Sequence, residues 1–130
     1  MDLIESKTGV EFMRLTLRCR ELDRRLASKF GLAVDEIHCL FELVADEIPC
    51  VKSLSEVLGV SSSRTSRILK NLELRGLVQR AIKTEDRRKE DVSLTAEGRS
   101  LAESILIDSV QIGTKLFGEG VPTMPRSPLS

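Results

Sequence analysis

Apolar residues recur at helical spacing in the first quarter of the chain. From about Gly9 to Phe30 they alternate at intervals of three and four residues, which places them in one narrow seam along a helix. The seam consists of Phe12, Leu15, Cys19, Leu22 and Leu26. Gly31 stands where a glycine commonly ends a helix. A seam this narrow suits packing against another helix, and a helix of a second subunit is one candidate.

Two amphipathic segments and a polar-faced one follow. Residues 34–45 carry an apolar stripe at helical spacing, and residues 51–58 repeat it, with the small Ser55 where a neighbouring helix would cross. The stripe of the first segment is Ile37, Leu40, Phe41 and Val44. A glycine then breaks the chain, and Ser61 or Ser62 caps the next helix by accepting from its backbone N–H groups. A short helix, a glycine-containing turn and a polar-faced helix in series predict a helix-turn-helix.

Beyond Gly76 the pattern changes to the alternation that is typical of strands. Residues 77–83 and 90–95 predict two strands, and Val92 and Leu94 alternate with polar residues as a half-buried strand requires. The segment between them is polar and charged, which indicates a hairpin tip rather than core. The pattern therefore predicts a mainly α fold with a small two- or three-stranded β wing.

A final helix is expected to start at Thr95, its N-cap, and to end near residue 117. Its buried residues should include Leu101 and Ile105, with Val110 and Leu116 as further candidates. Residues 118–130 are rich in proline and glycine, and we expect them to form a disordered tail.

Bulk composition fits a single globular domain. The chain has 130 residues, of which 31% are charged and 41% hydrophobic, enough for one core. No apolar run approaches the ~20 residues that span a bilayer, and the N-terminal stretch lacks a signal-peptide pattern. The three cysteines are odd in number and far apart, which fits a reducing compartment. We therefore expect a cytoplasmic protein without membrane contact.

Catalysis and metal binding find little support in the sequence. It contains no P-loop, no G-x-S-x-G and no H-E-x-x-H motif, so we expect neither enzyme activity nor a cofactor. His38 is the sole histidine, whereas zinc sites use three or four ligands, so no metal site is expected. His38 is more readily interpreted as a helix-surface or partly buried polar residue.

The net charge is zero, but the charges are unevenly distributed. Residues 61–90 hold nine Lys and Arg against four Asp and Glu, a local charge of +5, and the remainder carries −5. Such an asymmetry marks a surface for an anionic partner. A solvated charged face is the alternative interpretation.

The order of these elements resembles the MarR family of winged-helix transcription regulators. The resemblance covers roughly Phe12 to Leu116, and its most specific part is DRRKEDVSLTAEG (86–98), which matches the family's wing signature of D-x-R, a spacer, V-x-L-T and x-x-G. SLSEVLGVSSSRTSRILKNLELRGLV (53–78) matches the family's helix-turn-helix. The resemblance implies a homodimeric regulator, most often a repressor, that binds a pseudo-palindromic operator in double-stranded DNA.

The same resemblance divides the chain into four parts. Residues 1–33 would form an N-terminal dimerisation helix and residues 34–95 a winged helix-turn-helix DNA-binding domain. Residues 96–117 would form a C-terminal dimerisation helix, followed by the tail at 118–130.

The polar face of the predicted recognition helix carries the candidate DNA contacts. Such a helix lies in the major groove, where its N-terminal half reaches base edges, and arginine pairs with guanine in bidentate fashion. The candidates for base contact are Ser62, Ser63, Arg64, Ser66 and Arg67. Ser61, Lys70 and Arg75 are better placed for phosphates, which fix position rather than sequence. Helix capping and ordinary solvated surface are the alternatives for these residues.

The hairpin tip carries a second group of candidates. Arg88 would enter the adjacent minor groove, where a narrow groove concentrates negative potential. The resemblance implies that Asp86 orients the Arg88 guanidinium through a salt bridge. Arg87 and Lys89 would contact phosphates. A charged turn that only aids solubility is the alternative.

Regulators that resemble this family respond to a small molecule or to cysteine oxidation. With four phenylalanines and neither Trp nor Tyr, the chain offers few walls for an aromatic effector, yet a small-molecule effector stays open. Cys19 lies in the apolar seam and is interpreted as core, and Cys39 is ambiguous. Cys50 precedes a helix, where the pKa of a thiol is lowered, so it is a hypothetical redox site. The absence of tyrosines that could cradle an oxidised thiol counts against this hypothesis.

A second function stays open on the sequence alone. A winged-helix adaptor could dock its basic face on an acidic protein without specific DNA binding. Salt-dependent binding to a preferred duplex would distinguish the regulator from the adaptor.

Overall fold

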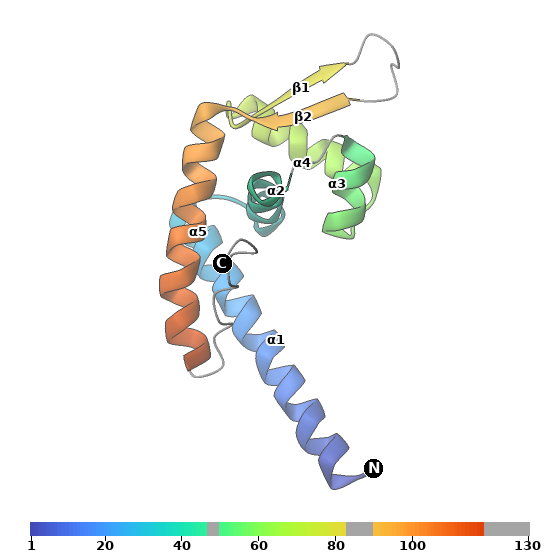
Figure 1. The fold of residues 1–130 in the computed structure, drawn as a ribbon, viewed down its shortest axis with the longest axis vertical. Coiled ribbons are helices and arrows are strands. Elements are labelled where there is room, and N and C mark those ends of the chain that lie inside the picture. The colour runs from blue at the N-terminus through green and yellow to red at the C-terminus, as the bar shows by residue number, and fades with distance from the viewer. Residues whose placement is uncertain (47–49, 83–89, 119–130) are drawn as a thin grey trace, which may run out of the picture.

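The computed structural model describes residues 1–46, 50–82 and 90–118 of the chain. These residues form five α-helices and one two-stranded antiparallel sheet (Figure 1). In chain order they are α1 (Leu3–Phe30), α2 (Val34–Ala45), α3 (Val51–Leu58), α4 (Ser62–Leu74), β1 (Val78–Ile82), β2 (Glu90–Leu94) and α5 (Ala96–Phe117). The predicted mainly α fold with a small β wing is confirmed, with two strands in the described part.

The first helix is longer than the apolar seam predicted. It begins at Leu3 rather than near Gly9 because the Asp2 carboxylate accepts from the backbone N–H of Ile4 at 3.0 Å and caps the helix. It ends at Gly31, whose φ of 64° lies in the left-handed region that favours glycine. The N-terminal half of α1 extends away from the rest of the molecule (Figure 1).

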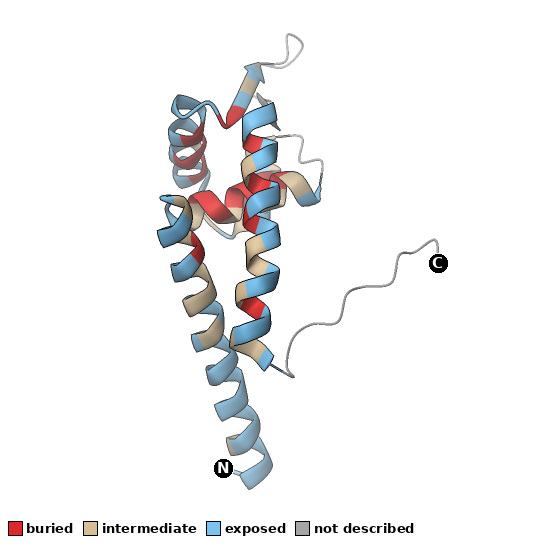
Figure 2. Ribbon diagram, turned by 90° about the vertical axis from the view of Figure 1, so that its left-hand side faces the viewer, coloured by how far each residue is buried: buried red, intermediate tan, exposed pale blue. Residues whose placement is uncertain are grey.

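This extension overturns one prediction about the seam. Leu26 is buried, but Cys19 is exposed, and so is Phe12 with 64% of its surface accessible. The prediction that Cys19 is core is therefore wrong for the single chain, because no described residue of another element covers the Cys19 side chain, although the neighbouring Arg18 lies over the ring of Phe117 at the end of α5. Burial is confined to the C-terminal end of α1, where it meets α2 and α5 (Figure 2).

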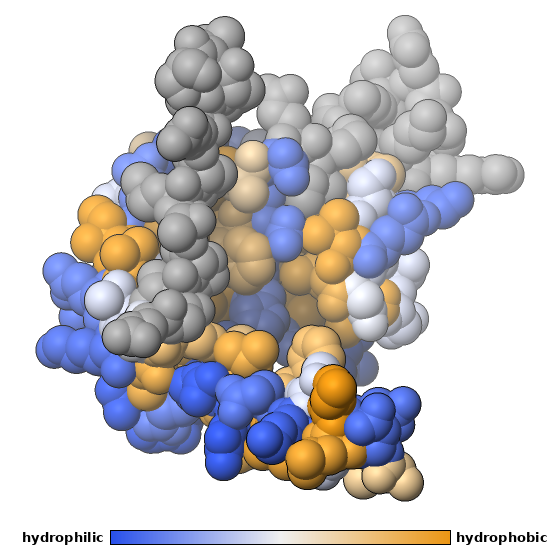
Figure 3. Space-filling view, turned by 60° about the horizontal axis from the view of Figure 1, so that its bottom comes forward, coloured by the Kyte–Doolittle hydropathy of each residue, from blue (hydrophilic) through white to orange (hydrophobic). Residues whose placement is uncertain are grey.

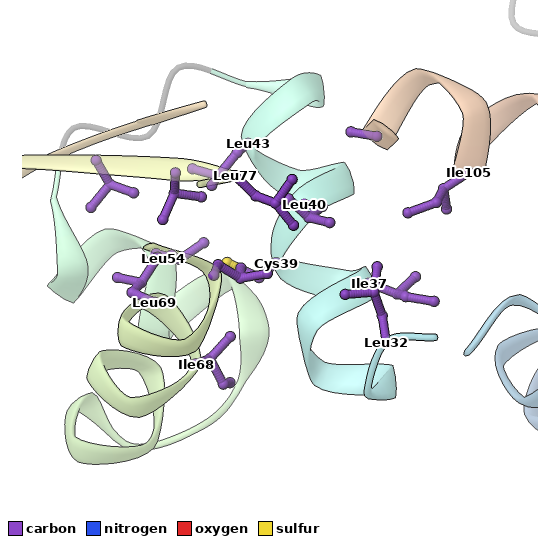
Figure 4. Packing of buried hydrophobic residues seen from close by; sticks show 14 of the residues in the cluster. Leu32, Ile37, Cys39, Leu40, Leu43, Leu54, Ile68, Leu69, Leu77 and Ile105 are labelled. Carbon is purple, nitrogen blue, oxygen red and sulfur yellow. The ribbon is translucent and has the colours of Figure 1, made fainter. Parts of the chain in front are cut away.

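The core is centred on α2, which contacts α1, α3, α4 and α5. Its side chains Ile37, Cys39 and Leu40 are almost completely buried (Figure 4). Of the predicted stripe, Phe41 and Val44 are only half-buried. Leu43 and Cys39 are buried in their place.

The α3–turn–α4 unit forms the predicted helix-turn-helix. Ser55 is buried, and its Oγ lies 2.8 Å from Oγ1 of the fully buried Thr65, so two small hydroxyl residues allow the helices to cross closely. Gly59 closes α3 with a φ of 69°. Of the two predicted caps for α4, Ser61 is the one observed, since its Oγ accepts from the backbone N–H of Arg64 at 3.1 Å.

The hairpin and α5 are joined by Thr95. Strand β1 pairs with β2 in the register Val78↔Leu94. The Thr95 hydroxyl accepts from the Gly98 N–H at 2.9 Å and lies 2.7 Å from the carbonyl oxygen of Gly76, to which it can donate. The predicted N-cap is therefore confirmed.

Burial along α5 agrees with only part of the prediction. Ile105 is buried and Leu101 and Leu116 are half-buried, whereas Val110 is 62% exposed, so its prediction as a core residue is wrong. Val110 lies on a side of α5 that no other described element of the chain covers. The predicted disordered tail falls almost entirely within residues 119–130, outside the described residues.

Candidate nucleic-acid interface

Helix α4 presents a continuous polar face to solvent. Ile68, Leu69 and Leu72 turn into the core, which anchors the helix along its length. The predicted contact residues on its other side are exposed, except that Ser66 is half-buried; they are Ser61, Ser62, Ser63, Arg64, Ser66, Arg67 and Lys70. Apart from Leu74 at its C-terminal end, which is 78% exposed, α4 buries its large apolar residues and presents a basic, hydroxyl-rich face that can enter the major groove.

Arg64 makes an ion pair with a helix outside the helix-turn-helix. Its Nε donates to Oδ2 of Asp35 on α2 at 3.0 Å, and its Nη2 contacts the same oxygen. The side chain remains 56% exposed. This pair could not be predicted from the sequence, because the two residues are 29 positions apart and no local pattern connects them.

Arg75 lies at the other end of α4 and also has a partner within the chain. Its Nη1 donates to the carbonyl oxygen of Gly31 at 3.2 Å, which links the end of α4 to the end of α1. The residue is exposed. Since one guanidinium has five N–H donors, this hydrogen bond leaves others for a phosphate.

A further arginine, Arg80, lies in the middle of β1, and no pattern in the sequence marked it as a candidate. Nη2 of Arg80 on β1 lies 3.4 Å from Oε1 of Glu73, and its side chain is only 20% exposed. This ion pair connects β1 to α4, so it braces the hairpin against α4.

The predicted wing contacts lie outside the described residues. Asp86, Arg87, Arg88 and Lys89 belong to residues 83–89, which connect β1 to β2 beyond the last described pair of the ladder, Ile82↔Glu90.

The cysteines occupy three different environments. Cys39 is buried, and burial, with a smaller contribution from the nearby Glu36 carboxylate, raises the pKa of its thiol to about 12. Cys50 is half-buried at the N-cap of α3, with its Sγ 3.3 Å from Oγ of Ser53. Cys39 is therefore protonated and unreactive at neutral pH, which removes the ambiguity about it.

His38 is partly buried, as one of the sequence interpretations stated. Its Nε2 lies 2.9 Å from Oδ1 of Asp23 on α1, and its ring meets Phe41 edge-on with centroids 5.7 Å apart. Within residues 1–46, 50–82 and 90–118, no group of three or more His, Cys, Asp or Glu could hold a metal ion. None of the helices in that part of the chain is long and apolar enough to cross a membrane.

Comparison with known proteins identifies similar folds. The model of the MarR family matches residues 32–89. AbsC, a MarR family transcriptional regulator from Streptomyces coelicolor, superposes with a TM-score of 0.78 at 21% identity, over 95% of this chain and 84% of that one.

Two further solved structures carry ligands. CouR from Rhodococcus jostii RHA1, bound to p-coumaroyl-CoA, gives a TM-score of 0.75 at 21% identity over 94% of this chain and 85% of its own. A mutant of MepR from S. aureus bound to an oligodeoxyribonucleotide gives 0.66 at 19% identity, over 90% and 85%. No curated protein matches the chain significantly.

Proposed function

We propose that the chain is a homodimeric transcriptional regulator, a repressor, that binds double-stranded DNA sequence-specifically, and the match of residues 32–89 to the MarR family model supports this proposal. The observation that carries the proposal is the face of α4. Helix α4 is anchored in the core by its four buried residues, and it offers Arg64 and Arg67 in its exposed N-terminal half. The solved structure of the similar MepR mutant on an oligodeoxyribonucleotide supports a DNA ligand for this fold.

In this proposal, α4 enters the major groove with its N-terminus toward the bases. Arg64 and Arg67 read base edges, while Ser62, Ser63 and Ser66 permit close approach and add hydrogen bonds. The residues proposed to contact phosphates are Ser61, Lys70, Arg75, Arg87 and Lys89. At the wing, Arg88 would enter the minor groove, oriented by Asp86.

The two long helices supply the proposed dimer contact, with residues 1–33 and 96–117 flanking the DNA-binding domain at 34–95. Large apolar side chains stand exposed on α1 among charged ones, as the view onto its N-terminal end shows (Figure 3). Those on the two helices include Leu3, Ile4, Val10, Phe12, Met13, Leu17, Ile107 and Val110. At roughly 25 cal/mol per Å² of apolar surface, covering them with a second copy favours association. The two α4 helices would then meet half-sites about one helical turn apart on a pseudo-palindromic operator.

Two inputs are proposed for control of DNA binding. A small-molecule effector is supported by the similar fold of CouR, which was solved with p-coumaroyl-CoA. Oxidation of Cys50 is the other, since the residue lies at the start of the helix-turn-helix. Peroxide should then weaken DNA binding by the wild type but not by Cys50→Ser, and an equal response of both proteins would eliminate the redox input.

The function is tested by selecting duplexes from a random pool and measuring affinity against salt. A dimer that covers roughly 6–10 phosphates should lose about 10³–10⁵ in affinity between 50 and 200 mM salt, and should keep its sequence preference throughout. The adaptor alternative shows neither property.

Two double variants that each remove two arginines test whether the DNA contact lies on α4. Arg64→Ala/Arg67→Ala should lower affinity for the selected duplex by ~25-fold or more, since each bidentate pair contributes ~1–3 kcal/mol. Arg20→Ala/Arg24→Ala removes the same charge from α1 and should change it by less than about fivefold. Equal losses in both variants would show that net charge, rather than α4, governs binding.

A further inference from the structure

Arg64 on α4 is held by a carboxylate from α2. Nε and Nη2 of Arg64 both point at Oδ2 of Asp35, which lies in the first turn of α2. We propose that Asp35 is a positioning residue that orients Arg64 toward one base of the bound DNA and so determines sequence preference at that base. This inference rests on the proposed function, because it requires α4 to lie in the major groove.

The geometry of the pair leaves the reading edge of Arg64 unoccupied. A guanidinium carries five N–H donors in one rigid plane. Asp35 accepts from the side of that plane formed by Nε and Nη2. The two parallel N–H groups at the end of the plane, one on each Nη, match O6 and N7 of guanine. Among the described residues, no hydrogen bond occupies that end.

A purely stabilising role does not explain the pair. The side chains of Arg64 and Asp35 are 56% and 35% exposed, and ion pairs at such accessibility contribute little to folding. Capping of α2 is already provided by Glu36, whose carboxylate accepts from the Ala33 N–H at 2.8 Å. A hollow of about 320 Å³ beside the pair, lined by both residues and by Arg67, keeps the guanidinium accessible to a ligand. What the pair does is fix the direction of a long side chain.

Fixing that direction favours base contacts over phosphate contacts. An arginine that is already ordered loses less side-chain freedom when it binds a base. The negative charge of Asp35 also repels a phosphate that approaches Arg64. Phosphate contacts carry no sequence information and would compete with a base for the same N–H donors, so this repulsion favours base contacts. Asp35 therefore strengthens the correct complex and weakens incorrect ones, which is how specificity arises.

A double-mutant cycle tests the inference on the full-length protein. Affinities for the selected duplex, and for versions changed at one base pair each, are measured for the wild type, Asp35→Ala, Arg64→Ala and the double variant at one salt concentration. Asp35→Ala should lower the preference at the base pair read by Arg64 by roughly 5- to 20-fold, within the range for one bidentate pair. In the Arg64→Ala background, it should have no further effect on preference.

Two control variants separate positioning from charge and folding. Glu42→Ala removes a carboxylate from the same helix and should leave every preference unchanged. Asp35→Asn keeps the shape of the side chain and removes its charge, so it takes the place of Asp35→Ala if that variant does not fold. It should show a smaller loss of preference at the same base pair.

The outcomes distinguish this inference from the proposed function. If Asp35→Ala weakens all duplexes alike, alters preference equally with and without Arg64, or tightens binding at unchanged preference, the positioning role is overturned while DNA recognition stands. If the wild type selects no duplex from the pool, the proposed function fails, and the inference fails with it.

Discussion

Gly98 lies where α5 passes against the base of the hairpin. A Cβ built on Gly98 would stand 1.9 Å from the carbonyl oxygen of Leu77 and 2.8 Å from its carbonyl carbon. Both atoms are backbone, so no side-chain rotation relieves the contact. The same oxygen accepts from the Thr95 N–H at 3.1 Å, so α5 cannot move away from Leu77 without straining the turn that begins the helix. The glycine of the x-x-G signature is therefore required by close packing.

The magnitude of Gly98→Ala follows from three contributions. Overpacking against rigid backbone costs ~1–3 kcal/mol. Strain on the Thr95 hydrogen bond adds ~1 kcal/mol. Replacing a helical glycine by alanine returns up to ~1 kcal/mol. The net expectation is a loss of ~1–3 kcal/mol in the free energy of unfolding, which corresponds to a melting temperature lower by about 3–15 °C.

Urea unfolding at a fixed protein concentration measures this loss, with the midpoint shifted and the slope unchanged. Gly113→Ala and Gly9→Ala are matched controls, because both glycines lie within helices and a Cβ on either meets nothing within 4 Å. Both should be neutral or stabilising by up to ~1 kcal/mol. If Gly98→Ala were as stable as Gly113→Ala, the packing argument would be refuted.

Three further predictions concern single side chains. Hydrogen bonds from Arg24 and, to a smaller extent, Arg25 lower the pKa of Glu21 to about 2. The contribution of Glu21 to folding stability is therefore present above pH 4.5 and is lost as the pH falls toward 2. The stability difference between the wild type and Glu21→Gln, measured from unfolding curves, should vanish over that pH window and shrink in high salt. Cys39 should resist a thiol reagent at pH 8 when it is the sole cysteine, and should react only on unfolding, because burial keeps it protonated; rapid labelling of the folded protein would contradict this. Thr65→Val should cost ~1 kcal/mol or more in the free energy of unfolding, since it removes a buried hydroxyl that bonds across the helix crossing; an unchanged urea midpoint would show that the hydroxyl is dispensable.

The sequence predicted those parts of the fold that depend on local chemistry. The bounds of α2 and α3 were predicted correctly because their apolar residues follow helical spacing and Gly59 marks the end of α3, and Ser61 and Thr95 act as the helix caps that their residue types favour. Polar residues of α4 were found on its exposed face for the same reason, since helical periodicity separates the two sides.

The errors share a different physical origin. Cys19 and Val110 were predicted to be buried, yet both are exposed in the single chain. An apolar stripe indicates that a helix packs against something, but it does not distinguish a partner within the chain from one in a second subunit. The ion pair of Asp35 with Arg64 was not predicted, because it depends on how α2 and α4 cross in space.

The continuity of the core restricts how such a dimer could release DNA. One buried cluster includes Leu26 and Ile105 from the long helices together with Leu54 and Leu69 from the helix-turn-helix, and α2 lies between the two groups (Figure 4). Since close-packed interiors transmit strain rather than absorb it, the long helices and α4 should move as one body. In the proposed dimer, a ligand that changes the distance between the two α4 helices would therefore act at the contact between subunits, to which α1 and α5 would contribute their exposed apolar residues. Its effect on DNA affinity equals its preference for one arrangement of the subunits over the other.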